Sequence, residues 1–195
     1  MFYEPKNGHG LPHSPFNAIV APRPIGWIST RGSQGDNLAP YSFFNALAYD
    51  PPQVMFSGGL KDSIRNVQET GVFAVNVVSE GALPQMNVTS TKLPRGTDEF
   101  FQAGVEKAEC NTISCPRVAM SPATLECRAS HILPLLGDDN DWIVIAEVTG
   151  IHIREEYMTD GRLDLTKVRP AARLGYRDYA IITSLFELSR PDDPL

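Results

Sequence analysis

The sequence predicts a mainly β fold, an antiparallel sandwich or barrel with a few short helices. At least six segments have the apolar, β-branched and aromatic composition of strands, and turn-forming residues separate them at short intervals. Few helical segments lie between them, which argues against repeated βαβ units. No G-x-G-x-x-G pattern follows any strand candidate, so a dinucleotide-binding Rossmann domain has no support.

The first half of the chain contributes four strand candidates, each bounded by turn or break signals. Gly32 ends the first of them, and the S-Q-G-D-N that follows has turn composition. Pro40 lies within the second, which indicates an edge strand or a break because proline donates no hydrogen bond to a sheet. Asp50-Pro51-Pro52 ends that second strand. The four candidates are Pro24–Arg31, Leu38–Tyr49, Val54–Gly58 and Val72–Ser79.

A short helix is predicted between the third and fourth strands. Asp62 or Ser63 can cap its N-terminus, and Ile64 and Val67 share one face. Gly71 supplies the left-handed residue that commonly ends a helix. Two further short helices are expected at Gly81–Val88 and Asp98–Gln102.

The second half contributes three more strand candidates: Ala123–Leu133, Trp142–Arg154 and Tyr179–Thr183. In the middle one, isoleucine recurs at alternate positions, as expected for one face of a strand. This alternation leaves Glu147 on an otherwise apolar face, formed by Ile143, Ile145, Thr149, Ile151 and Ile153.

Length and composition fit a single domain spanning residues 1–195, with 42% hydrophobic and 21% charged residues. The net charge of −6 argues against nucleic acid as the main partner, because binding to a phosphate backbone requires a basic face. The first residues lack the apolar segment of a signal peptide, and the longest apolar stretch, Trp142–Ala146, is too short to cross a bilayer. We therefore expect a cytoplasmic protein without a membrane or nucleic-acid partner.

The cysteine and histidine patterns favour neither disulfides nor a metal site. Cys110, Cys115 and Cys127 form no C-x-x-C pair, and we expect all three to be free thiols in a reducing compartment. The four histidines contain no H-E-x-x-H arrangement, so no metal centre is expected.

The loop Ser57–Ser63 (SGGLKDS) is the first candidate for function. It leaves a strand and enters a helix, and it brings two glycines, two hydroxyls and Lys61. Helix N-termini carry free N–H groups and partial positive charge, so this loop is suited to a phosphate monoester. The G-x-x-x-x-G-K-[ST] spacing of a Walker A loop is absent. Taken alone, the loop also fits an ordinary capped helix with Lys61 in solvent.

Two further segments combine aromatic, hydroxyl and glycine residues. Arg23–Thr30 (RPIGWIST) can offer an aromatic face and hydroxyl donors, and Arg23 can bind a phosphate through charge-assisted hydrogen bonds. In Asn37–Asn45 (NLAPYSFFN), Pro40 can free backbone groups to hydrogen-bond a heteroaromatic ring. Each segment also has a purely structural interpretation, a strand with Trp27 in the core and an edge strand with exposed aromatics.

Together these motifs resemble the flavin reductase-like family, which includes the reductase component of nitrilotriacetate monooxygenase and flavoredoxin. The similar motifs are RPIGWIST, NLAPYSFFN followed by DPP, KDSIRNVQETGVFAVNVV and VRPAARLGYRDY, in that order, within roughly residues 16–180. The resemblance implies a six-stranded antiparallel split β-barrel (Greek key) with flanking short helices. It also implies a homodimer with FMN near the subunit interface.

The resemblance further implies which residues hold the flavin. Trp27, Ser29 and Thr30 are expected along the flavin and its ribityl chain, and Ala39, Tyr41 and Ser42 at the ring. The phosphate is expected at Ser57, Lys61 and Ser63, with Arg23 beside them. The full expected set of cofactor contacts is Arg23, Trp27, Ser29, Thr30, Ala39, Tyr41, Ser42, Asn45, Ser57, Lys61 and Ser63. His152 is the candidate catalytic residue, facing flavin or nicotinamide; its structural alternative is a half-buried strand histidine.

The function implied is an FMN-binding oxidoreductase in which NADH or NADPH reduces flavin by hydride transfer. Such chemistry depends on orienting two rings, so the absence of an acid–base triad is expected. A monooxygenase or electron-transfer partner is compatible with this function. One alternative is an FMN-binding electron-transfer protein similar to flavoredoxin, reduced by a protein partner. Another is a barrel for a different small ligand, similar to the family only in fold.

Overall fold

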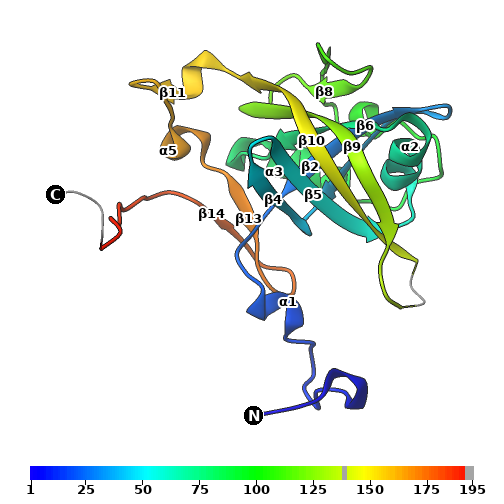
Figure 1. Ribbon diagram of the computed structural model, residues 1–195, viewed down its shortest axis with the longest axis vertical. Coiled ribbons are helices and arrows are strands. Elements are labelled where there is room, and N and C mark those ends of the chain that lie inside the picture. The colour runs from blue at the N-terminus through cyan, green and yellow to red at the C-terminus, as the bar shows by residue number, and fades with distance from the viewer. Residues whose placement is uncertain (138–139, 192–195) are drawn as a thin grey trace.

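The computed structural model describes residues 1–137 and 140–191 (Figure 1). The remaining residues of the expected domain, 138–139 and 192–195, lie outside the described residues. The main element is a seven-stranded antiparallel sheet of order β3-β2-β6-β9-β10-β5-β4. Its strands are β2 (Gly26–Gly32), β3 (Gly35–Tyr41), β4 (Phe44–Tyr49), β5 (Pro52–Gly59), β6 (Val72–Val77), β9 (Ala123–Pro134) and β10 (Asp141–Ile153).

The two edges of this sheet, β3 and β4, are consecutive in the chain and separated only by Ser42 and Phe43. So short a connection brings the edges together, and the sheet curls into a barrel that is split between β3 and β4 (Figure 1). Across this connection, the N–H of Ser57 in β5 donates to the carbonyl of Phe43 at 2.8 Å. The mainly β, antiparallel split barrel predicted from the sequence is therefore confirmed.

The barrel sheet has seven strands where six were expected. The expected run Leu38–Tyr49 forms two strands, β3 and β4, because the chain turns at Ser42 and Phe43. Pro40 lies in β3, which has one sheet neighbour and so tolerates a residue without an N–H donor, as predicted.

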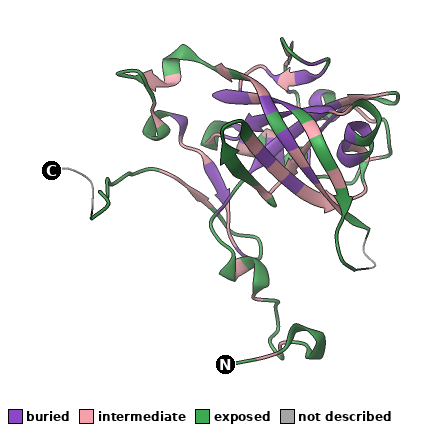
Figure 2. Cartoon of the chain, in the orientation of Figure 1, coloured by how far each residue is buried: buried purple, intermediate pink, exposed green. Residues whose placement is uncertain are grey.

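One hydrophobic cluster fills the barrel interior (Figure 2). Helix α2 (Asp62–Thr70) packs Ile64 and Val67 onto this cluster, as their shared face predicts. The strand residues of the cluster are Ile28, Val54, Phe56, Phe73, Val75, Cys127, Val144, Ala146 and Val148.

A second cluster lies on the other face of β2 and β3, under helices α3 (Leu83–Val88) and α4 (Glu99–Gln102). Trp27 and Leu38 from the sheet pack there with Met86 of α3 and Phe100 of α4. Since Ile28 faces the barrel interior, β2 is buried on both faces. The two helices confirm the expected short helices near residues 81–88 and 98–102.

Helix α2 begins differently from the expectation. Its N-cap is Lys61, and no capping side chain bonds its first turn in the described chain, so the predicted Asp62 or Ser63 cap is wrong. The Ser63 hydroxyl donates to Oδ1 of Asn37 at 2.7 Å instead. The predicted stop is confirmed, because Gly71 ends the helix with φ of 72°.

The expected single isoleucine face of β10 is wrong. Ile143 pairs with Leu133, but the β9–β10 register shifts between Val148 and Gly150. Such a bulge reverses the faces of the residues that follow it. Ile151 and Ile153 therefore lie on the opposite face from Ile143, and they are 59% and 44% exposed.

Smaller elements complete the chain. A three-stranded sheet joins β1 (Arg23–Pro24) to β13 (Ala171–Arg173) and β14 (Tyr179–Ile181), which places the C-terminal segment beside the start of the barrel. No helix in the described part of the chain is long and apolar enough to cross a membrane. The other elements are α1 (Phe16–Ile19), α5 (Leu165–Val168), η1 (Pro5–Asn7), η2 (Glu80–Ala82), η3 (Glu155–Tyr157), β7 (Lys107–Glu109), β8 (Pro116–Val118), β11 (Met158–Thr159) and β12 (Arg162–Leu163).

Candidate functional site

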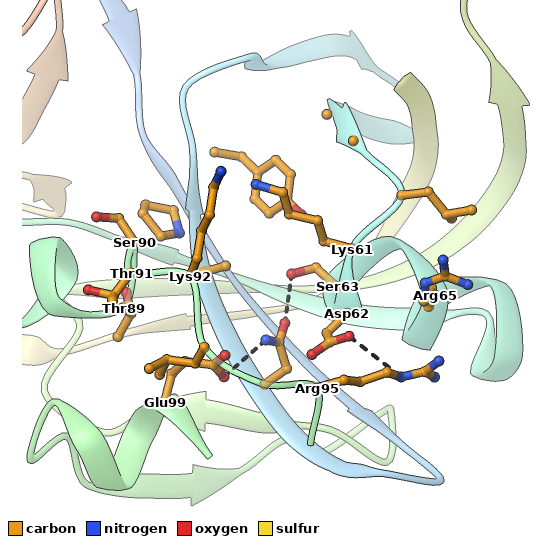
Figure 3. A pocket seen from close by; sticks show the side chains of 18 residues that line it. Lys61, Asp62, Ser63, Arg65, Thr89, Ser90, Thr91, Lys92, Arg95 and Glu99 are labelled. Atoms are coloured by element: carbon orange, nitrogen blue, oxygen red, sulfur yellow. Dashed lines mark hydrogen bonds and ion pairs between the residues drawn. The ribbon is translucent and has the colours of Figure 1, made fainter. Parts of the chain in front are cut away.

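The start of α2 lines an open pocket of about 530 Å³, here called the cationic pocket (Figure 3). Edge strand β3, the end of β5 and the loop after α3 form its other walls. The lining residues are Asn37, Ala39, Pro40, Tyr41, Gly58, Gly59, Leu60, Lys61, Asp62, Ser63, Arg65, Thr89, Ser90, Thr91, Lys92, Leu93, Arg95 and Glu99.

Positive charge dominates the mouth of this pocket. Of the four basic residues, only Arg95 has an ion-pair partner among the described residues, with its Nε 3.5 Å from Oδ1 of Asp62. The ends of the Lys61 and Lys92 side chains point to the same side of the pocket in Figure 3. The uncapped N-terminus of α2 adds partial positive charge there. An anion that enters the pocket therefore meets unpaired cations and free N–H groups.

A hydrogen-bond chain fixes the floor of the cationic pocket (Figure 3). Ser63 donates to Asn37 Oδ1 at 2.7 Å, and Asn37 Nδ2 donates to Oε2 of Glu99 at 2.9 Å. The same Glu99 oxygen accepts from the N–H of Leu38 at 3.1 Å. Burial raises the pKa of the Glu99 carboxyl, although the Leu38 and Asn37 donors oppose this shift. Asn37 is thereby held with its carbonyl toward the start of α2.

Strand β3 supplies a flat wall of the pocket. It is an edge strand, so the backbone groups of Leu38 and Pro40 face away from β2. The Leu38 N–H donates to Glu99 and Pro40 has no N–H, which leaves the two carbonyls free for a ligand. Tyr41 packs edge-on against Phe56, with ring centroids 4.9 Å apart, and burial raises the pKa of its phenol to about 12. Tyr41 is thus a neutral, fixed aromatic wall beside those free backbone groups.

Two further pockets continue from the cationic pocket, one after the other. One, here called the arginine pocket, has a volume of about 300 Å³ and shares Pro40 and Ser90 with it. The other is an apolar groove of about 520 Å³ that shares Arg23 and Ser42 with the arginine pocket. Together the three pockets follow the chain from the start of α2 around the turn between β3 and β4.

The structure brings eight of the eleven expected cofactor contacts to this surface. Four of them line the cationic pocket: Ala39, Tyr41, Lys61 and Ser63. The other four line its neighbours: Arg23 and Ser42 in the arginine pocket and the groove, and Asn45 and Ser57 in the groove. Because Arg23 lies outside the pocket of Lys61, the expectation that both meet one phosphate is not supported by their positions.

The side chains of Trp27, Ser29 and Thr30 lie inside the protein and outside these three pockets. Nε1 of Trp27 donates to the Thr89 hydroxyl at 2.9 Å, and the Ser29 hydroxyl donates to the carbonyl of Pro116 at 2.7 Å. Thr30 accepts from Nδ2 of Asn66 at 3.0 Å. The structure does not bring these three side chains to the pocket surface, because the barrel core covers one face of β2 and α3 and α4 cover the other.

His152 also lies away from the cationic pocket. Asp141, at the other end of β10, pairs with Gly59 of that pocket, whereas His152 pairs with Thr124 of β9. Its Nε2 is 2.5 Å from Oε1 of Glu126, and its side chain is only 22% exposed. This environment fits the half-buried strand histidine of the structural alternative, and His152 is not among the residues that line the cationic pocket of its own chain.

The loop after α3 is the part of the site that was not predicted. It contributes the run Thr89-Ser90-Thr91-Lys92, followed by Arg95. A hydroxyl-rich run with lysine just after a predicted helix was the available signal. Nothing in the local sequence shows that this run meets Lys61, since the two come together only through the fold.

Comparisons with known proteins find similarity over most of the chain. The sequence model of the flavin reductase like domain matches residues 20–169. An uncharacterised protein of Deinococcus radiodurans is 37% identical over 188 residues, covering 89% of this chain and 82% of that protein.

Two solved structures are similar over nearly the whole chain. Nitrilotriacetate monooxygenase component B from Bacillus cereus is 29% identical, covers 96% of this chain and 98% of its own, and superposes with a TM-score of 0.88. The 2-nitrobenzoate 2-nitroreductase NbaA of Pseudomonas fluorescens is 28% identical, with coverages of 91% and 89% and a TM-score of 0.83.

Proposed function

Because the chain belongs to the flavin reductase-like family, we propose that it is an FMN-binding oxidoreductase that reduces flavin with NADH or NADPH. The observation that carries this proposal is the cationic pocket, where unpaired lysines and a helix N-terminus adjoin the free edge of β3. This donor set fits FMN, which combines a phosphate monoester with a planar ring that needs hydrogen bonds along one edge.

In this proposal the phosphate lies at the start of α2. Lys61 and Ser63 hold it together with Lys92 and the hydroxyls of Ser90 and Thr91. The ring lies along β3, where Ala39 and Tyr41 line the pocket, the carbonyls of Leu38 and Pro40 face away from β2, and Ser42 follows. A volume of about 530 Å³ is in the range of ordinary cofactor pockets.

The flavin, when bound, supplies the hydride-accepting centre. The chain contributes binding and orientation, since the rate depends on holding two rings in contact and excluding competing geometries. The fixed Tyr41 ring and the Asn37–Glu99 hydrogen bond serve this purpose, because they hold the pocket walls in one arrangement. An acid–base residue at the ring is not required.

An absorption spectrum tests the proposal. We expect purified protein loaded with FMN to be yellow, and NADH or NADPH to bleach it under anaerobic conditions. A yellow protein that neither nucleotide bleaches contradicts the reductase activity and points to electron transfer from a protein partner. A protein that retains no flavin, and whose melting temperature FMN does not raise, contradicts FMN binding itself.

We further propose that the protein is a homodimer with one domain over residues 1–195. Pairing of β1 with β13 joins the two ends of the domain, and the exposed Ile151 and Ile153 offer a contact for a second copy. Similarity to a monooxygenase component supports a monooxygenase as the acceptor of reduced flavin. The three free thiols support a reducing compartment such as the cytoplasm.

A further inference from the structure

The arginine pocket contains two guanidinium groups and no acidic side chain among the described residues that line it. Arg23 in β1 and Arg173 in β13 are direct partners in the antiparallel ladder. Like charges at directly opposed positions destabilise a sheet. The arrangement therefore carries an electrostatic cost, and no acidic side chain among the described residues pairs with either arginine to offset it.

Arg23 is buried without an ionised partner. It is 7% exposed, and its Nη atoms donate only to backbone carbonyls, those of Asn17, Val20 and Leu174. Its Nε is buried and has no hydrogen-bond partner among the described residues. Burial lowers the pKa of Arg23, and the charge of Arg173 lowers it further. A buried cation in these conditions is stabilised most by an anion.

Among the described residues, most of the N–H donors of Arg173 have no partner. Its Nη2 donates to the carbonyl of Tyr176, and its guanidinium lies 4.6 Å from the ring centroid of Tyr179. A guanidinium has five N–H donors in a planar fork that matches carboxylate and phosphate oxygens. Ser42 and Ser90 add neutral hydroxyls to the same pocket.

We propose that the arginine pocket binds the carboxylate or phosphate of the second substrate, the compound that exchanges electrons with the flavin. This inference rests on the proposed FMN binding. Pro40 and Ser90 belong to both pockets, so an anion held by the two arginines lies next to a ring that extends along β3. A volume of about 300 Å³ suits one small anionic group, such as a benzoate or the phosphate end of a nucleotide.

The test is calorimetric titration of FMN-loaded protein with benzoate, with neutral benzamide, and with oxidised nicotinamide dinucleotide. Arg173→Gln is the test variant, because Arg173 is partly exposed and its loss leaves the carbonyl contacts of Arg23 in place. Arg162→Gln is the matched control, since the Arg162 side chain is 84% exposed and belongs to the β11–β12 hairpin, outside the arginine pocket. Its Nη1 lies 3.8 Å from Oε1 of Glu187. Melting temperatures of all variants report whether the fold is intact.

We expect the parent and Arg162→Gln to bind benzoate but not benzamide, and Arg173→Gln to bind benzoate at least tenfold more weakly. Arg173→Lys should recover part of the affinity, because it restores the charge but not the fork. If Arg173→Gln binds only the nicotinamide dinucleotide tenfold more weakly than the parent does, the bound anion is a phosphate of that dinucleotide, which also supports the proposal.

Two results overturn it. Equal affinities of the parent and Arg173→Gln for both anionic compounds show that the pocket binds neither. A selective loss of FMN affinity, with riboflavin unaffected, assigns the arginines to the cofactor's own phosphate. Failure of the proposed function appears separately, as a parent protein that binds no FMN, and the anion titrations can still be made on that protein.

Discussion

Nε2 of His152 lies 2.5 Å from Oε1 of Glu126, and this pair closes a cage around a fully buried carboxylate. The N–H groups of Asn111 and Thr112 donate to Glu126 at 2.7 and 2.6 Å, and the Thr112 hydroxyl donates at 2.6 Å. Burial alone would raise the pKa of Glu126, but these donors outweigh it and lower the pKa to about 2. The carboxylate thereby ties the 111–112 loop to β9 and β10.

This caged carboxylate predicts an acid-sensitive component of stability. A carboxyl with a lowered pKa in the folded state stabilises the protein above its unfolded pKa of about 4.5 and loses this effect as the pH falls toward 2. We expect about 3 kcal/mol of unfolding free energy to be lost over that window. Urea unfolding at pH 7 and pH 3 measures about 2 kcal/mol of this loss, since part of the stabilisation persists at pH 3, and Glu126→Gln should lack this component. Exposed Glu147→Gln is the control; a shared pH dependence of Glu126→Gln and the parent would contradict the assignment.

His152→Ala should lower the free energy of unfolding without a comparable loss in the rate of flavin reduction. The variant removes one charge-assisted donor from Glu126, which is worth about 1.5–3 kcal/mol of unfolding free energy. Because His152 lies away from the cationic pocket, we expect the rate of flavin reduction to change less than twofold. Stopped-flow reduction by NADH, with denaturant unfolding of the same samples, measures both quantities. A large loss of rate with unchanged flavin affinity would restore the catalytic role expected from the family resemblance.

Lys61→Ala should weaken FMN binding by about 1–3 kcal/mol, the scale of a charge-assisted hydrogen bond in a partly desolvated site. Fluorescence titration with FMN and with riboflavin measures the loss. Riboflavin has no phosphate, so its affinity should be the same in parent and variant. Lys6→Ala, which removes an exposed lysine paired only with Glu4, is the matched control. Equal FMN affinities of Lys61→Ala and the parent would remove Lys61 from the phosphate site.

Gly58→Ala should disturb the pocket wall, whereas Gly59→Ala should not. A Cβ at Gly58 would lie 2.8 Å from Cε1 of Tyr41, whose ring is held against Phe56. A Cβ at Gly59 would meet Oδ1 of Asp141 at 3.6 Å, an ordinary contact. Displacing the Tyr41 ring should cost about 1–3 kcal/mol of unfolding free energy, as for other overpacked sites, and should also weaken FMN binding. Titration of both variants decides it: equal affinities would show that the Tyr41 wall does not contact the flavin.

Local sequence patterns predicted the positions of the strands well, but they predicted poorly on which face of the sheet each side chain lies. Pro40 identified an edge strand because a missing N–H is a property of one residue. The bulge between Val148 and Gly150 depends on how β10 pairs with β9, and no alternation within β10 reveals it. The sequence around Trp27 allows both a ligand wall and a core residue, and its burial is visible only once α3 and α4 are seen to cover β2.

The same limit applied to the site. The Lys61–Ser63 loop was predicted because a strand, a glycine pair and a helix start are contiguous in sequence. Lys92 and Glu99 lie 31 and 38 residues beyond Lys61 in the sequence and reach the same pocket through the packing of α3 and α4 against the sheet. Long-range proximity of this kind has no local signature. The sequence motif therefore predicted the Lys61–Ser63 side of the pocket, and only the structure identified the side formed by Lys92 and Glu99.

The end of β10 predicts how two copies associate. Residues 148–153 continue to pair with β9 after the pairing with β5 has ended at Glu147, so one edge of this segment is free. Ile151 and Ile153 lie on it, and they are 59% and 44% exposed. A free strand edge with exposed isoleucines favours contact with another chain.

We therefore expect the parent to sediment as a dimer and Ile151→Lys to dissociate at a concentration at least tenfold higher than the parent does. Leu136→Lys, at a fully exposed leucine in the β9–β10 turn, should leave the dimer unchanged. Analytical ultracentrifugation over a range of concentrations measures all three proteins, and a parent that is monomeric throughout that range would refute the dimer together with this assignment of its interface.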